Sequence, residues 1–257
     1  MTLAKVFILL CLLSFSSAYA NEGFPGREKY PDVPYISLDD LYSGYMNDKY
    51  TIIDARSKFE YNIIKINKAI NVPLSQDDFL ETITAIANKT RKPIVFYCNG
   101  RRCMKSYKAA IASKLSNVFV FDAGVFEWTV KHPEEASLLN KTPVDPNKLI
   151  SKSDFKKHFV PLQEFETLIK DSILLDVRDS RQRQGTGLFL LADRSAPLDK
   201  TKKLNRYLNK AVTENKRLLA YDQTGKQVRW LQYYLEEKGI KEYYFMEGGA
   251  KYYTYGQ

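Results

Sequence analysis

The residue of this sequence with the clearest chemical potential is Cys98, which follows an apolar run and opens a loop rich in cations. The run from Pro93 to Tyr97 predicts a buried strand, and functional groups of open parallel sheets gather where strands end. Backbone N–H groups of such a loop form a nest for an anion, and the same field favours a thiolate. We therefore expect Cys98 to be a nucleophile with a depressed pKa. The alternative is a packed residue at the end of a strand.

The residues after Cys98 are candidates for binding an anionic substrate, because they combine backbone donors with positive charge. They are Asn99, Gly100, Arg101, Arg102, Cys103, Met104 and Lys105. In a curled loop Cys103 reaches disulfide distance from Cys98, which makes it a resolving thiol or a redox latch; otherwise it is a small loop residue. Asp54 and Arg56 either orient this loop or only fix the fold. His132 and His158 are the only histidines, so neither a metal cluster nor a cysteine–histidine dyad is supported. We also expect no cofactor.

Several landmarks of the first half recur in the second half at nearly constant separation, which indicates an internal duplication. The pairs are Asp54-Ala-Arg56 with Asp176-Val-Arg178, Pro73-Leu74 with Pro197-Leu198, Tyr97-Cys98 with Tyr221-Asp222, and Gly124 with Gly248. Apolar runs that alternate with helical periodicity predict an α/β fold, with a central mostly parallel sheet and helices on both faces in each half. The expected domains cover residues 30–135 and 159–257, with a linker at 136–158.

Residues 1–20 have the order of a secretory signal, with Lys5, an apolar run from Val6 to Leu13, and small residues before Ala20. The run is too short to cross a bilayer, so we expect cleavage before Asn21 and no membrane attachment afterwards. The expected location is the periplasm, with secretion as the alternative. The net charge of +9 is interleaved with acidic residues, and no basic helix appears. We therefore expect attraction of small anions and no binding of nucleic acid.

Over about residues 34–134, the sequence resembles the rhodanese family of sulfurtransferases. The resemblance is carried by Asp54-Ala-Arg56, Glu60-Tyr61, Ala69-Ile-Asn-Val-Pro73, Cys98, and Gly124 with Trp128. It implies tandem rhodanese-like domains and a transfer of sulfane sulfur from a small anionic donor such as thiosulfate, through a Cys98 persulfide, to a thiol or cyanide-like acceptor. Family loops carry arginine at the position of Cys103, and a longer, wider loop leaves phosphatase chemistry open.

Two further functions remain open beside the sulfurtransferase. Cys98 and Cys103 can cycle together in a thiol-disulfide or persulfide-relay protein, or both domains can form a non-catalytic binding module. The second domain has Asp222 in place of the cysteine, and a carboxylate cannot hold a persulfide and repels anions. We expect this domain to be non-catalytic and to stabilise or occlude the first, or to recruit a protein partner.

Overall fold

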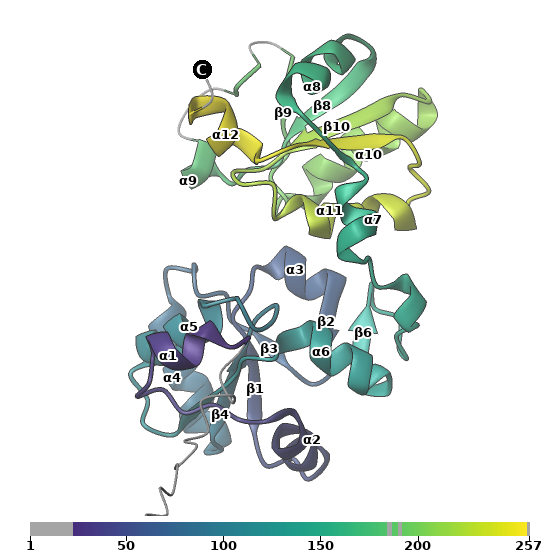
Figure 1. The fold of residues 1–257 in the computed structure, drawn as a ribbon. Helices are drawn as coiled ribbons and strands as arrows, with labels where there is room; N and C mark the ends of the chain where they lie inside the picture. Colours follow the sequence, from purple (N-terminus) through teal and green to yellow (C-terminus); the bar gives the residue numbers. More distant parts are fainter. Residues whose placement is uncertain (1–22, 184–186, 190–191, 256–257) are drawn as a thin grey trace, which may run out of the picture.

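The computed structural model describes residues 23–183, 187–189 and 192–255; the expected signal segment at 1–20 lies outside these ranges. Two parallel sheets, each flanked by helices, form two α/β domains that follow one another along the chain (Figure 1). The predicted α/β fold class is therefore confirmed. Within the described ranges, no helix is both long and apolar enough to span a membrane.

The first domain is built on a parallel sheet with the strand order β3-β1-β4-β5. The strands of this domain are β1 (Thr51–Asp54), β2 (Ile64–Ile66), β3 (Ile70–Asn71), β4 (Ile94–Tyr97), β5 (Val118–Phe121) and β6 (Ala136–Leu138). The helices are α1 (Pro25–Lys29), α2 (Leu38–Met46), α3 (Lys58–Ile63), α4 (Phe79–Thr90), α5 (Lys105–Ser113) and α6 (Gly124–Lys131). Asp54 lies opposite Tyr97, and Tyr97 lies opposite Phe121, so the loops after these strands meet at one edge.

Alternate residues of these strands pack into different apolar clusters on the two faces of the sheet. Ile53 and Phe96 belong to a cluster that includes Phe79 of α4 and Tyr107 of α5. The cluster on the other face combines strand residues with residues of α2, α3 and α6; it includes Ile52, Val95, Phe121, Leu41, Phe59 and Trp128. Burial on both faces leaves no position for alternating polar residues, which explains the uninterrupted apolar runs.

The beginning of the expected linker at 136–158 belongs instead to the first domain. β6 pairs antiparallel with β2, with Leu138 opposite Ile64. The backbone N–H of Val144 then donates to the carbonyl of Pro133, so the chain still lies on this domain at that point. Because β6 is only three residues long and stands between proline-containing segments, its composition resembles that of a linker.

The second domain has a parallel sheet with the order β7-β11-β10-β8-β9. Its strands are β7 (Phe159–Val160), β8 (Ser172–Asp176), β9 (Arg194–Ser195), β10 (Arg217–Tyr221) and β11 (Tyr243–Met246). Its helices are α7 (Lys152–Lys156), α8 (Leu162–Leu168), α9 (Ser180–Arg183), α10 (Thr201–Thr213), α11 (Val228–Glu237) and α12 (Gly249–Tyr255). Apolar residues of α10 and α11 pack on one face of this sheet, and residues of α8 and α12 pack on the other.

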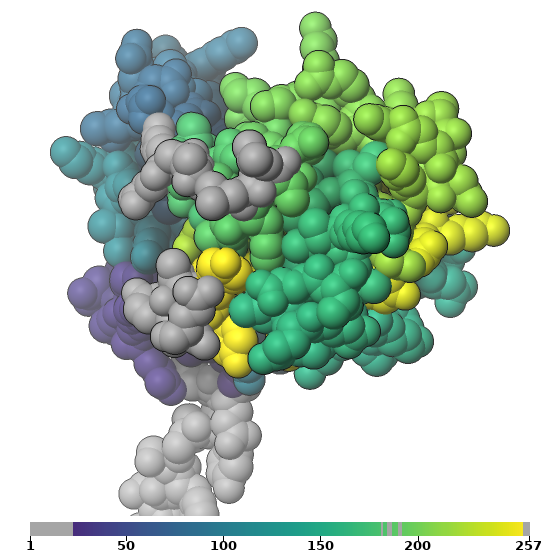
Figure 2. Space-filling view, turned by 90° about the horizontal axis from the view of Figure 1, so that it is seen from above, coloured from purple at the N-terminus to yellow at the C-terminus, as the bar shows by residue number. Residues whose placement is uncertain are grey.

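The two domains share an apolar contact in which α3 faces α11 (Figure 1). The rings of Phe59 and Tyr234 meet edge to face at 5.9 Å, and Phe126 stacks on Trp230 at 5.5 Å. Seen from above, the second domain covers most of the first, whose purple and blue segments emerge at one side (Figure 2). The buried core therefore continues from one domain into the other.

Candidate active site

Cys98 lies directly after β4, at the edge where the ends of the parallel strands meet. It is fully buried, and its Sγ lies 3.1 Å from the carbonyl oxygen of Cys103 and 3.4 Å from Oγ of Ser106. Gly124 packs against the start of the loop with a φ of +72°, and a Cβ there would come within 2.4 Å of the backbone nitrogen of Gly100. Glycine is therefore required for this close approach, which fixes the path of the loop.

Cys103 lies in the same loop and is the more exposed of the two cysteines. The Cys98 side chain and the backbone N–H groups of Asn99 and Lys105 lie near its sulfur and favour its charged form. These contacts, chiefly the one with Cys98, lower the pKa of the Cys103 thiol to about 6, and the charge of Lys105 adds to the effect. At neutral pH the Cys103 sulfur is therefore a thiolate.

The expectation of a depressed pKa at Cys98 is wrong in this geometry. Burial raises the pKa of the Cys98 thiol well above its ordinary value, and the neighbouring Cys103 sulfur raises it further. The loop does supply backbone N–H groups, but those of Asn99 and Lys105 favour the charged form of Cys103 rather than that of Cys98. The two cysteines form no disulfide here, and near neutral pH the pair holds one proton, on Cys98.

This protonation state predicts the pH dependence of alkylation at Cys103. We expect its rate of reaction with iodoacetamide to rise with pH around a midpoint near 6, because the thiolate is the reactive form. Cys98→Ala should move the midpoint upward by removing the largest stabilising contact, whereas Cys98→Ser keeps a hydroxyl donor and should move it less. Peptide mass spectrometry over a pH series measures both rates. A midpoint at the ordinary thiol value in the parent protein would contradict the shared proton. Lys105, paired with Glu60, is the other charged group at this sulfur.

Asp54 and Arg56 form a buried ion pair that reaches the loop. Both side chains are fully buried, and the guanidinium donates to both carboxylate oxygens of Asp54. Its Nη1 donates to Oδ1 of Asn99 at 3.1 Å, and its Nη2 donates to the carbonyl of Ile64 at 2.6 Å. Trp230 of the second domain lies with its ring 5.4 Å from this guanidinium. The structure therefore places the predicted supporting pair directly against the residue after Cys98.

Glu60 is a further member of this site whose role the sequence does not reveal, although it stands in the quoted motif. Its carboxylate accepts hydrogen bonds from Nδ2 of Asn99 at 3.1 Å and from Nζ of Lys105 at 3.3 Å. Burial alone would raise the pKa of Glu60, but the charges of Lys105 and Arg56 and the hydrogen bonds bring it below the ordinary value. The ionised carboxylate of Glu60 thus binds a residue at each end of the loop, Asn99 and Lys105.

The three loop cations differ in how they are held. Arg101 forms an ion pair with Glu127 at 2.8 Å and stacks over the ring of Phe24, and Lys105 pairs with Glu60. Arg102 is exposed, while Gly100 and Met104 contribute backbone to the turn before α5. The predicted anion-binding residues therefore share one loop, but two of its three cations already face a carboxylate. Within the described ranges, no group of three or more His, Cys, Asp or Glu side chains is placed to hold a metal ion.

In the corresponding loop of the second domain, the side chain of Asp222 occupies the backbone N–H donors. The carboxylate of Asp222 accepts hydrogen bonds from four backbone N–H groups, those of Thr224, Gly225, Gln227 and Val228. Burial nevertheless keeps the pKa of Asp222 above its ordinary value. The donors that would receive a substrate anion are thus occupied, in addition to the absence of a thiol at this position.

We expect Asp222→Ala to lower the free energy of unfolding by about 2–4 kcal/mol, because it leaves four N–H donors without an acceptor in a buried loop. The loss in free energy of unfolding for Asp222→Asn should be smaller than that for Asp222→Ala, since the amide keeps one acceptor oxygen. Urea denaturation followed by circular dichroism measures the change. Lys226→Ala is a matched control in the same loop, because the described hydrogen bonds of Asp222 are made without the Lys226 side chain. Equal losses in Asp222→Ala and this control would contradict the assignment.

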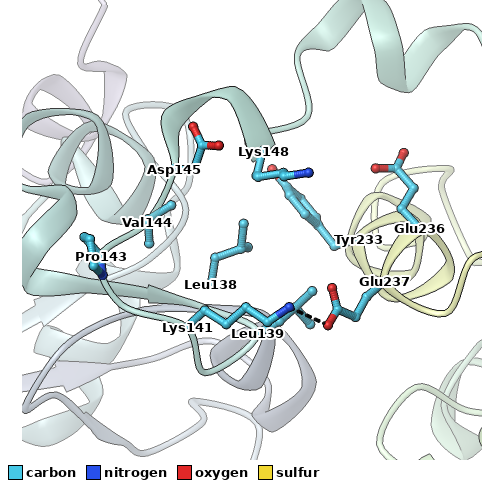
Figure 3. A pocket seen from close by; sticks show the side chains of 10 residues that line it. All are labelled: Leu138, Leu139, Lys141, Pro143, Val144, Asp145, Lys148, Tyr233, Glu236 and Glu237. Atoms are coloured by element: carbon cyan, nitrogen blue, oxygen red, sulfur yellow. Dashed lines mark hydrogen bonds and ion pairs between the residues drawn. The ribbon is translucent and has the colours of Figure 1, made fainter.

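Two cavities near the contact between the domains are not lined by Cys98. One of about 310 Å³ lies between the segment after β6 and α11, and none of its lining residues belongs to the 98–105 loop (Figure 3). Lys141 and Glu237 form an ion pair across it at 2.8 Å. Another, of about 350 Å³, lies between the domains and is lined by Glu60 and Trp230 among others. It adjoins the supporting residues of the loop.

Comparison with known proteins finds relatives of the first domain. Residues 37–131 match the family model of the rhodanese-like domain. A curated relative, the tRNA uridine(34) hydroxylase of Buchnera aphidicola, is 25% identical over 97 residues, which are 37% of this chain and 31% of that protein. The chain thus spans about a third of the length of this relative.

Two solved structures are similar to this chain or to part of it. The thiosulfate sulfurtransferase from Pseudomonas aeruginosa is 18% identical, with a TM-score of 0.35, and covers 90% of this chain and 46% of its own. The human single-domain sulfurtransferase TSTD1 is 25% identical, with a TM-score of 0.31, and covers 38% of this chain and 97% of its own. The motifs and the family match agree that residues 37–131, which include Cys98, are similar to rhodanese-like domains.

Proposed function

We propose that the first domain is a sulfurtransferase that carries sulfane sulfur as a persulfide on Cys98. The donor is a small anion such as thiosulfate, and the acceptor is a thiol or a cyanide-like nucleophile. The observation that carries this proposal is the loop after β4, in which the buried Cys98 sulfur lies 3.1 Å from the carbonyl oxygen of Cys103 and 3.4 Å from Oγ of Ser106, with Cys103 as a second free cysteine. The family match over residues 37–131 supports it.

The shared proton explains how a buried thiol becomes a nucleophile. When Cys98 attacks the outer sulfur of thiosulfate, its proton moves to the thiolate of Cys103. The S–S bond of the donor breaks, sulfite leaves with the electron pair, and the outer sulfur stays on Cys98. Ser106 Oγ, 3.4 Å from the Cys98 sulfur, and the start of α5 favour the negative charge during this step.

The test is the formation of thiocyanate from thiosulfate and cyanide by the purified protein. We expect turnover, and when the acceptor is omitted we expect the release of one sulfite per molecule as Cys98 takes up the outer sulfur. A folded protein that neither forms thiocyanate nor releases sulfite would favour the non-catalytic binding module instead.

We further propose that the second domain supports the first domain and presents a surface to a protein partner. Its Trp230 lies against Arg56, and its Asp222 loop holds its own carboxylate in place of a substrate anion. In this proposal the first domain carries out the reaction and the second domain binds the partner. Pull-down with the intact protein and with a Trp230→Ala variant tests whether this contact affects partner capture. Thiocyanate formation by the same two proteins tests whether it affects the chemistry.

The mature protein is proposed to be exported, with the periplasm as its location. We expect N-terminal sequencing of the protein recovered from that compartment to begin at or near Asn21, because small residues stand at both recognition positions before it. Recovery of protein that still contains Lys5 would contradict cleavage.

A further inference from the structure

The two cysteines of the loop are arranged as a reacting pair. Both cysteines are free in one tight loop, and the Sγ of Cys98 lies 3.1 Å from the backbone carbonyl oxygen of Cys103. A persulfide on Cys98 therefore forms beside the residue that carries the second sulfur, whose charged form the loop favours. An external acceptor, in contrast, must first diffuse to a residue that is fully buried.

We infer that Cys103 attacks the Cys98 persulfide, so that the loop releases its sulfane sulfur as hydrogen sulfide and closes a Cys98–Cys103 disulfide. This inference rests on the proposed sulfurtransferase function, because it requires the persulfide. It adds a second product, a second reacting residue and an external dithiol as the partner that restores the loop.

The step balances with the single proton that the pair holds. After loading, the proton on Cys103 moves to the outer sulfur of the persulfide. The Cys103 thiolate then attacks the inner sulfur, the bond between the two sulfurs of the persulfide breaks, and hydrogen sulfide leaves as its anion with the electron pair. The sulfane sulfur gains two electrons, and the two cysteine sulfurs lose them on forming the disulfide.

The difference in exposure between the two cysteines determines which sulfur of the disulfide an external reductant attacks first. A dithiol reductant has access to the partly exposed Cys103 and can form a mixed disulfide there, which releases Cys98 into its buried position. The second thiol of the reductant then frees Cys103 and is itself oxidised. Cys103 is thus the sulfur that faces the reductant in each cycle.

The experiment uses the fully reduced, desalted protein with excess thiosulfate and no other thiol or cyanide. In the parent protein we expect one sulfite and one sulfide per molecule, after which the reaction stops, and a mass lower by two hydrogens. Cys103→Ser should release one sulfite but no sulfide, and should keep one added sulfur on Cys98. A dithiol such as dithiothreitol should restart sulfide release in the parent protein.

The possible outcomes separate the two proposals. Absence of sulfite from both the parent protein and Cys103→Ser would contradict the sulfurtransferase itself. A parent protein that keeps its added sulfur and releases no sulfide would leave the transferase intact and overturn the role of Cys103. Equal sulfide release from both proteins would also overturn it. Peptide mapping of the parent protein, which needs no variant, must show the Cys98–Cys103 disulfide.

Discussion

Cys98→Ser is expected to slow sulfur loading at least about 10³-fold, which corresponds to roughly 4 kcal/mol on the barrier. A serine hydroxyl is scarcely ionised, and it cannot form a persulfide even though it occupies the same buried position. Folding should change little, because the hydroxyl keeps the contacts with the carbonyl of Cys103 and with Ser106. Sulfite release on incubation with thiosulfate measures the loading, and thermal unfolding checks the fold.

Cys103→Ser is the matched control, because it removes the other sulfur of the same loop and leaves Cys98 in place. It should still gain one sulfur atom on Cys98, although more slowly, since the proton acceptor is lost. A persulfide found on Cys103 in the Cys98→Ser protein would show that the more exposed sulfur attacks the donor. The assignment of the two roles would then be reversed.

The second large effect is expected at Arg56. Arg56→Lys should lower the free energy of unfolding by about 3–5 kcal/mol, because it keeps the charge but loses most of the hydrogen bonds that satisfy a fully buried ion pair. One ammonium group cannot replace the fork that binds Asp54, Asn99 and the carbonyl of Ile64 together. Sulfur loading should also slow, since Asn99 loses one of its two anchors. Urea denaturation and single-turnover loading measure the two effects separately.

Arg178→Lys provides the corresponding control in the second domain. Arg178 also pairs with a buried aspartate, Asp176, at 2.8 Å, so its replacement should destabilise the protein as well. It lies in the domain without the cysteine, and loading on Cys98 should therefore be nearly unchanged. Equal slowing by both variants would mean that Arg56 acts through global stability rather than by holding Asn99.

The sequence was sufficient to predict the elements that are local in the chain. The apolar run before Cys98 is β4, the periodic segment after the loop is α5, and the duplicated landmarks lead to a second parallel sheet. These features follow from burial on two faces and from the order of strands and helices, which periodicity records directly. The prediction at 136–158 differed because a three-residue strand has no periodicity to read.

The details of the site depended on contacts between residues far apart in the sequence. Glu60 reaches Asn99 and Lys105, Arg101 is drawn to Glu127, and Trp230 arrives from the other domain. Composition cannot show which acid meets which base in the folded chain. The charge state of Cys98 was mispredicted for the same reason, because burial and a hydrogen bond to Cys103 outweigh the field of the loop.

The carboxylate in the Asp222 loop has a consequence for how the two domains respond to their surroundings. A ligand stabilises a folded protein by an amount that grows with the logarithm of the ratio of its concentration to its dissociation constant. Asp222 is tethered to the donors that it fills, so this loop is saturated whatever anions the solution contains. The loop of Cys98 has no such fixed occupant, because its donors hold a sulfur whose charge changes with protonation and oxidation. Added thiosulfate should therefore stabilise the first domain and leave the second unaffected.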